Sequence, residues 1–177
     1  MSKIVCSEII FELIKNRKMT GKEFIEKCLI EDIGEIVENK KYYHAFALMC
    51  IGIEFLGKCL NSDDIHKKGQ SSKDFNNALD TYQSLNKYKD FNDPYSALRC
   101  GLLHAFLPLE GVKLTDQDND FSTNTIGCTS LYSDFVEACD VAINNTLGFI
   151  LRNLDEPQLD IKGATSGTTT NLIKSIH

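Results

Sequence analysis

The sequence predicts an all-α protein, a bundle of five to six helices, and three observations support this class. Apolar residues recur every three to four positions through most of the chain. Only 3 prolines and 11 glycines occur in 177 residues, so long helices can form. Hydrophobic residues make up 42% and charged residues 25%, the proportions of a folded globular protein. We expect one helical bundle domain over residues 1–155 and an extended or mobile tail, rich in Gly, Ser and Thr, over 156–177.

Two helices are predicted before residue 40. Residues 3–18 end in basic side chains, which favour a helix C-terminus, and carry apolar residues at helical spacing: Ile4, Val5, Ile9, Ile10, Leu13 and Ile14. Thr20 and Glu23 have the spacing of a capping box, in which each side chain bonds the backbone N–H of the other residue. A second helix should run from there to about Asn39. Its expected buried side consists of Phe24, Ile25, Cys28, Leu29, Ile33, Ile36 and Val37.

The third predicted helix, over residues 41–60, is the most apolar. Its segment 45–53 is hydrophobic on nearly every side, which is typical of a helix at the centre of a bundle. The polar residues 61–73 should form a loop. Ser71 or Ser72 can then cap a fourth helix, whose buried face consists of Phe75, Leu79, Tyr82 and Leu85.

A fifth helix is predicted from Pro94 to about Phe106. Asp93 is a good N-cap residue, and proline fits the first helical position because its missing N–H would have no partner there. Pro108 cannot continue a helix and should end this one.

The residues after Pro108 predict an irregular segment and a last helix. Residues 111–115 can form a short strand paired with part of 120–127, so a small β-hairpin is expected within 108–128. A sixth helix should follow over about 129–153. Its apolar positions are Leu131, Phe135, Val136, Cys139, Ile143, Leu147, Ile150 and Leu151.

Composition restricts the classes of function. The formal charge of −6 gives no long-range attraction for a phosphate backbone, so contact with a nucleic acid would need a local basic patch. The seven cysteines are scattered without a CxxC motif, which indicates reduced thiols rather than a zinc site or disulfides. No apolar run approaches the roughly 20 residues that cross a bilayer, and Glu8 interrupts any signal peptide. We therefore expect a cytoplasmic protein without a membrane partner.

One pair of residues is chemically suggestive. Arg99 and His104 form an R-x4-H motif late on the fifth predicted helix. An arginine offers a fork of donors that suits a phosphate, and a histidine can move a proton near neutral pH. Five residues of α-helix correspond to about 140° of rotation, so a long side chain or a partner chain must bring the two together. Cys100 and His104, four apart, should share a face.

The chain resembles the HEPN superfamily, the higher eukaryotes and prokaryotes nucleotide-binding proteins. The resemblance rests on the R-x4-H motif and on residues 51–60, an apolar helix in which Lys58 follows Glu54 by four residues. It covers roughly residues 2–107. It implies a helical bundle and, in many members, a metal-independent ribonuclease in which dimerisation joins two R-x4-H motifs in one cleft.

The resemblance also implies roles and partners. Arg99 and His104 would be catalytic, and Glu54 a supporting residue. The protein would act as a homodimer on RNA, as a toxin or antiviral effector, with an antitoxin or another protein as a possible partner. No metal and no cofactor is expected, and no P-loop or G-x-G-x-x-G motif occurs. Active members usually carry Asn, Asp or His directly after the arginine. Cys100 occupies this position here, and we include it with Glu54 as a supporting residue.

Other interpretations remain open from the residues alone. Arg99 can simply pair with an acidic residue, and His104 can be a satisfied core histidine. Glu54 and Lys58 form an i, i+4 pair, which needs no function. The alternative to a ribonuclease is therefore a non-catalytic helical module of the same fold that binds a protein or a nucleotide.

Overall fold

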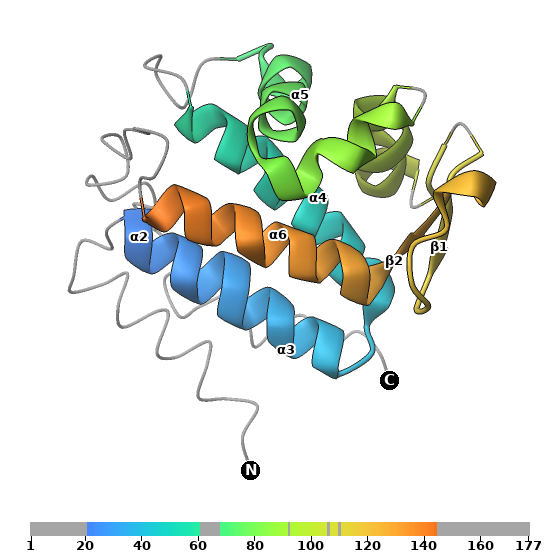
Figure 1. Ribbon diagram of the computed structural model, residues 1–177, viewed down its shortest axis with the longest axis horizontal. Coiled ribbons are helices and arrows are strands. Elements are labelled where there is room, and N and C mark those ends of the chain that lie inside the picture. The colour runs from blue at the N-terminus through green and yellow to red at the C-terminus, as the bar shows by residue number, and fades with distance from the viewer. Residues whose placement is uncertain (1–20, 61–67, 92, 106, 110, 145–177) are drawn as a thin grey trace, which may run out of the picture.

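Helix α4, Tyr42–Cys59, lies at the centre of a helical bundle, with the other helices packed around it (Figure 1). The computed structural model describes residues 21–60, 68–91, 93–105, 107–109 and 111–144. The helix expected over residues 3–18, Thr20 of the capping box and the tail over 156–177 lie outside these residues. The described part is mostly helical, so the prediction of an all-α bundle is confirmed.

One helix runs from residue 21 to residue 38, as predicted. It consists of α2 (Gly21–Phe24), a π-helical segment η1 (Ile25–Glu31) and α3 (Asp32–Glu38). Four apolar side chains spaced four apart are buried: Ile25, Leu29, Ile33 and Val37. This spacing turns one stripe of the helix towards the core. Asn39 follows as the C-cap, and its backbone N–H donates to the carbonyl of Glu35 at 3.0 Å.

Helix α4 has the predicted bounds, but it is not covered on every side. Most of its apolar residues are buried, including Phe46, Met49 and Ile53. Leu48 and Ile51, by contrast, are 37% and 42% exposed. The sequence could not predict this, because a helix that is apolar all round does not reveal which face its neighbours leave uncovered.

Two glycines let neighbouring elements approach α4 closely. A Cβ atom at Gly57 would lie 1.7 Å from the backbone carbonyl oxygen of Asp74, on helix α5 (Ser71–Thr81). A Cβ atom at Gly52 would lie 2.4 Å from Cζ of Phe135, on helix α6 (Cys128–Ile143). Only glycine permits such contacts, so these positions bring α5 and α6 onto α4.

The fourth predicted helix is divided into two elements. Helix α5 ends at Thr81, where Tyr82 adopts an extended conformation, and a 3-10 helix η2 (Gln83–Asp90) follows. All four residues of the predicted face are buried, which confirms that face. The predicted cap is wrong, because the N-cap residue is Gln70 and it makes no side-chain cap bond. Ser71 instead lies in the helix, and its side chain bonds Glu54 of α4.

The fifth helix follows the expected cap but has a different geometry. The backbone N–H of Ser96 donates to Oδ1 of Asp93 at 3.1 Å, which confirms Asp93 as the N-cap. The helix then runs as η3, Tyr95–Ala105, with π geometry rather than α geometry. A π-helix bonds residues five apart, so the faces expected from α periodicity change.

The strands pair as expected in position but not in direction. Strand β1 (Lys113–Thr115) pairs with β2 (Thr125–Gly127) in parallel, with Lys113 opposite Thr125. The expected hairpin would be antiparallel, so that prediction is wrong. A short 3-10 helix η4, Phe121–Thr123, lies between the strands and returns the chain to run beside β1 in the same direction. Helix α6 follows directly after β2, close to its predicted start, and its expected continuation beyond residue 144 lies outside the described residues.

Candidate functional site

The carboxylate of Glu54 organises a polar cluster between α4, α5 and η3. Glu54 is only 5% exposed. Its Oε2 accepts from Nε of Arg99 at 2.7 Å, and its Oε1 lies 3.1 Å from Nζ of Lys58. The Ser71 side chain is a third hydrogen-bond partner. A buried carboxylate needs such partners, since an unpaired charge in the interior is costly.

These contacts determine the protonation of Glu54. Burial raises the pKa of the Glu54 carboxyl, but hydrogen bonds from Ser71 and Lys58 and the positive charge of Arg99 lower it, and the net shift is downwards. Glu54 therefore carries its negative charge at neutral pH. That charge holds one edge of the Arg99 guanidinium in place.

The π geometry of η3 brings the two motif residues together within one chain. Nη1 of Arg99 lies 3.5 Å from Nε2 of His104. The α-helical estimate placed them about 140° apart. Residues five apart are hydrogen-bonded neighbours along a π-helix, so the same spacing places them one above the other. Neither a partner chain nor an unusually extended arginine is needed for this contact.

The same spacing applies to Cys100, which lies five residues after Tyr95. Tyr95 is hydrogen-bonded to Cys100, and burial together with this bond raises the pKa of the tyrosine. The Tyr95 ring also lies 5.8 Å from Cζ of Arg99, within cation–π range. Cys100 therefore holds the side chain of Tyr95, and the Tyr95 ring in turn contacts Arg99. The expectation that Cys100 shares a face with His104 came from α-helical spacing, which η3 does not have.

The arrangement leaves polar atoms available for a ligand. The bond to Glu54 uses Nε of Arg99, and a guanidinium carries four further N–H donors on its two terminal nitrogens. The Arg99 side chain is 20% exposed, and His104 is exposed. An imidazole at the surface beside a fixed guanidinium can exchange a proton with a bound molecule while the guanidinium contacts an anionic group on it.

The structure thus brings together three of the four residues that the sequence singled out: Arg99, His104 and Glu54. The fourth, Cys100, is hydrogen-bonded to Tyr95, whose ring lies beside Arg99. Sequence reasoning missed Ser71 and Tyr95. Ser71 was interpreted as a helix cap, and Tyr95 would have stood out only if π spacing had been considered.

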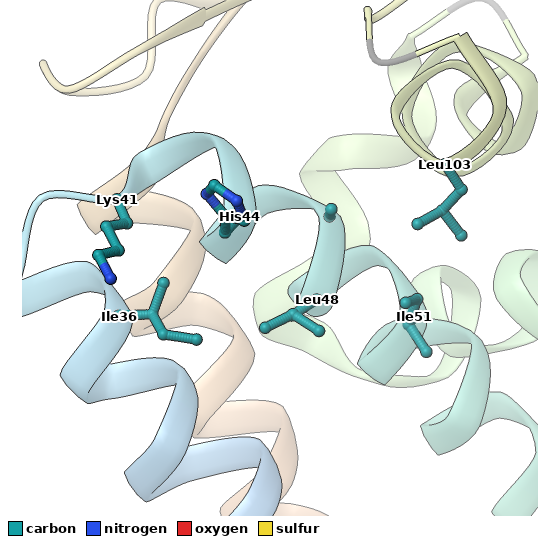
Figure 2. A pocket seen from close by; sticks show the side chains of 7 residues that line it. Ile36, Lys41, His44, Leu48, Ile51 and Leu103 are labelled. Carbon is teal, nitrogen blue, oxygen red and sulfur yellow. The ribbon is translucent and has the colours of Figure 1, made fainter. Parts of the chain in front are cut away.

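An apolar groove lies nearby on the exposed face of α4. Figure 2 shows Leu48 and Ile51 on α4, with Ile36 of α3 on one side and Leu103 of η3 on the other. The groove has a volume of about 480 Å³ and is lined by Ile36, Lys41, His44, Leu48, Ile51 and Leu103, together with an alanine. Arg99 and His104 are not among its lining residues.

Other site classes find no support in the described part of the chain. Within it, no group of three or more His, Cys, Asp or Glu side chains could hold a metal ion. None of the six cysteines that lie there forms a disulfide. None of its helices combines the length and the apolar character needed to cross a membrane.

Comparisons of the chain with protein-family models, with curated proteins and with solved structures found no match. The functional argument therefore depends on the residues and their geometry.

Proposed function

We propose that the protein is a metal-independent endoribonuclease that cleaves RNA with Arg99 and His104, in keeping with its resemblance to the HEPN superfamily. The observation that carries this proposal is the contact between the two motif side chains, 3.5 Å apart, with His104 open to solvent. A histidine buried in the core would be closed to a substrate. The exposure of His104 therefore favours a chemical role over a purely structural one.

The chemistry follows from the two side chains. In its neutral form, His104 takes the proton from a ribose 2′-hydroxyl. The 2′-oxygen then attacks the adjacent phosphorus, and the bond from phosphorus to the 5′-oxygen of the next nucleotide breaks. That 5′-oxygen takes a proton from water, and the imidazolium of His104 returns its proton to the solvent. The terminal nitrogens of Arg99 donate to the phosphate oxygens, which gain negative charge in the transition state. The products are a 2′,3′-cyclic phosphate and a 5′-hydroxyl.

Glu54 is the positioning residue in this scheme. Its bond to Nε of Arg99 restricts the guanidinium before RNA binds, which reduces the ordering needed on binding. In the form that the resemblance implies, two chains join their R-x4-H motifs in one cleft. An antitoxin or another protein would then control the activity.

A second candidate is the non-catalytic module that binds a protein or a nucleotide. Two observations favour it. Arg99 is already paired with an acidic side chain, as a structural arginine would be. Cys100 replaces the polar residue that usually follows the arginine in active members of the superfamily.

The deciding experiment is RNA cleavage in the presence of EDTA, followed by analysis of the product ends. We expect cyclic phosphate ends from the unmodified protein, and a loss of roughly 10²–10⁴ in rate for His104→Ala and for Arg99→Ala. His44→Ala is the matched control, because His44 is exposed on α4 outside the Glu54 cluster. If the unmodified protein cleaves no RNA, or if His104→Ala cleaves as fast as His44→Ala, the ribonuclease proposal is wrong and the binding module is favoured.

A further inference from the structure

We propose that the apolar groove on α4 binds a free aliphatic carboxylate. The carboxylate contacts Lys41 and His44 at one end of the groove, and the hydrocarbon chain lies along the exposed aliphatic side chains of α4. This inference is independent of the proposed ribonuclease activity, because Arg99 and His104 do not line the groove.

The floor of the groove is a single stripe of α4 that is apolar beyond His44. Its lining residues recur three and four positions apart, the spacing of one helix face: His44, Ala47, Leu48 and Ile51. Leu48 and Ile51 are 37% and 42% exposed, although most other apolar residues of α4 are buried. Ile36 of α3 and Leu103 of η3 lie on the two sides (Figure 2). A hydrocarbon chain laid along this stripe removes apolar surface from water, which favours binding.

The polar groups of the groove gather at one end. Figure 2 shows Lys41 and His44 at the end near Ile36, whereas Ile51 and Leu103 lie at the other end. None of the seven described residues that line the groove is acidic. Lys41 is exposed and forms no ion pair with another side chain in the described part of the protein. The ammonium is therefore available to an anionic ligand.

The donors at this end suit a carboxylate. An ammonium and an imidazole N–H can both donate to carboxylate oxygens. The single charge of the Lys41 ammonium balances the single charge of a carboxylate, whereas a phosphate monoester carries nearly two negative charges at neutral pH. A ligand with a carboxylate at one end and a hydrocarbon chain at the other thus matches the distribution of charge along the groove.

The size of the groove indicates the length of the chain. Its volume of about 480 Å³ lies in the range of small-molecule sites, roughly 300–1,000 Å³. The stripe from His44 to Ile51 extends about 10 Å at 1.5 Å per residue. An extended hydrocarbon chain advances about 1.3 Å per carbon, so roughly eight carbons match it. Two exposed aliphatic side chains offer far less than the roughly 800 Å² that each partner buries in a stable protein complex, which favours a small ligand over a second copy.

The test is a methyl NMR titration of the full chain with decanoate below its micelle concentration, since the eight methylenes of decanoate match the stripe. We expect the methyl signals of Leu48 and Ile51 to shift and to saturate. Those of Leu107, which is 64% exposed and outside the groove, should not move. Hexanoate lacks four of the methylenes. Burial of one side of a methylene contributes about twofold in affinity, so hexanoate should bind roughly tenfold more weakly.

Matched variants test the charged end of the groove. Lys41→Gln should weaken decanoate binding about two- to fivefold, the range of an exposed ion pair, and Lys41→Arg should retain it. Lys40→Gln is the control, because it changes the net charge equally at an exposed neighbour that does not line the groove. Decyltrimethylammonium has a chain of the same length with the opposite charge, so it should bind more weakly than decanoate.

Several results would overturn the proposal. Shifts that do not saturate, or that are as large at Leu107 as at Ile51, would show that decanoate does not occupy the groove. Equal affinities of Lys40→Gln and Lys41→Gln would exclude the carboxylate contact. Decanoate binding that weakens as the protein concentration rises would assign the groove to a second copy of the chain. Shifts at Leu48 and Ile51 with phosphatidylglycerol vesicles, but not with decanoate, would assign it to a membrane surface.

Discussion

Removal of the Glu54 carboxylate should destabilise the protein strongly, because three groups depend on it. Glu54→Ala deletes the acceptor for Nε of Arg99, for Nζ of Lys58 and for the Ser71 side chain. Breaking a buried ion pair by removing one partner costs about 3–5 kcal/mol. The Arg99 and Lys58 side chains are 20% and 27% exposed, so both cations regain some water, which reduces the cost to about 2–3 kcal/mol.

The assay is thermal and urea unfolding at neutral pH. For a chain of this size, a loss of 2–3 kcal/mol lowers the melting temperature by roughly 5–10 °C. Glu26→Ala is the matched control, since Glu26 also pairs with a lysine four residues away, at 3.6 Å, but both side chains are exposed. Its effect should stay below about 0.5 kcal/mol. Equal effects of the two substitutions would refute the role given to the Glu54 cluster.

The same cluster predicts a dependence of stability on pH. The folded protein holds the pKa of Glu54 below its ordinary value of 4.5. A lowered pKa means that folding favours the charged form, so this stabilisation is fully present above the unfolded pKa and is lost as pH falls through the folded pKa. The stability difference between the unmodified protein and Glu54→Gln should be constant near neutrality and shrink below about pH 4.5. A difference that grows on acidification would contradict this.

The remaining predictions concern other positions. His104→Ala should change stability by less than about 0.5 kcal/mol, because His104 is exposed; a large loss in a thermal melt would indicate a structural role. Gly57→Ala should cost more than about 3 kcal/mol in urea unfolding, since a Cβ atom there would lie 1.7 Å from the carbonyl oxygen of Asp74, and near-normal stability would contradict this packing. Burial raises the pKa of Cys50 to about 12 and that of Cys128 to about 11, so neither thiol should react with iodoacetamide in the native protein, as peptide mass analysis can check.

Local patterns were sufficient to predict most of the helices. The apolar run in the third predicted helix gave the bounds of α4 closely, because helix length depends mainly on nearby residues. Asp93 before Pro94 gave the start of the fifth helix, because capping depends on a few adjacent atoms. The R-x4-H spacing identified Arg99 and His104 as candidate site residues. Under α-helical periodicity the two lie about 140° apart, so a long side chain or a partner chain would have to bring them together.

Only the tertiary structure decided how these elements combine. The π geometry of η3 is a backbone arrangement that single-residue preferences do not encode, and it aligns Arg99 with His104. The partner of Arg99 is Glu54, 45 residues earlier in the chain, and such a long-range pairing depends on how α4 and η3 pack. The parallel direction of β1 and β2 and the uncovered face of α4 have the same origin. Periodicity shows which side chains are apolar, whereas packing between distant segments determines which of them are buried and which polar groups meet.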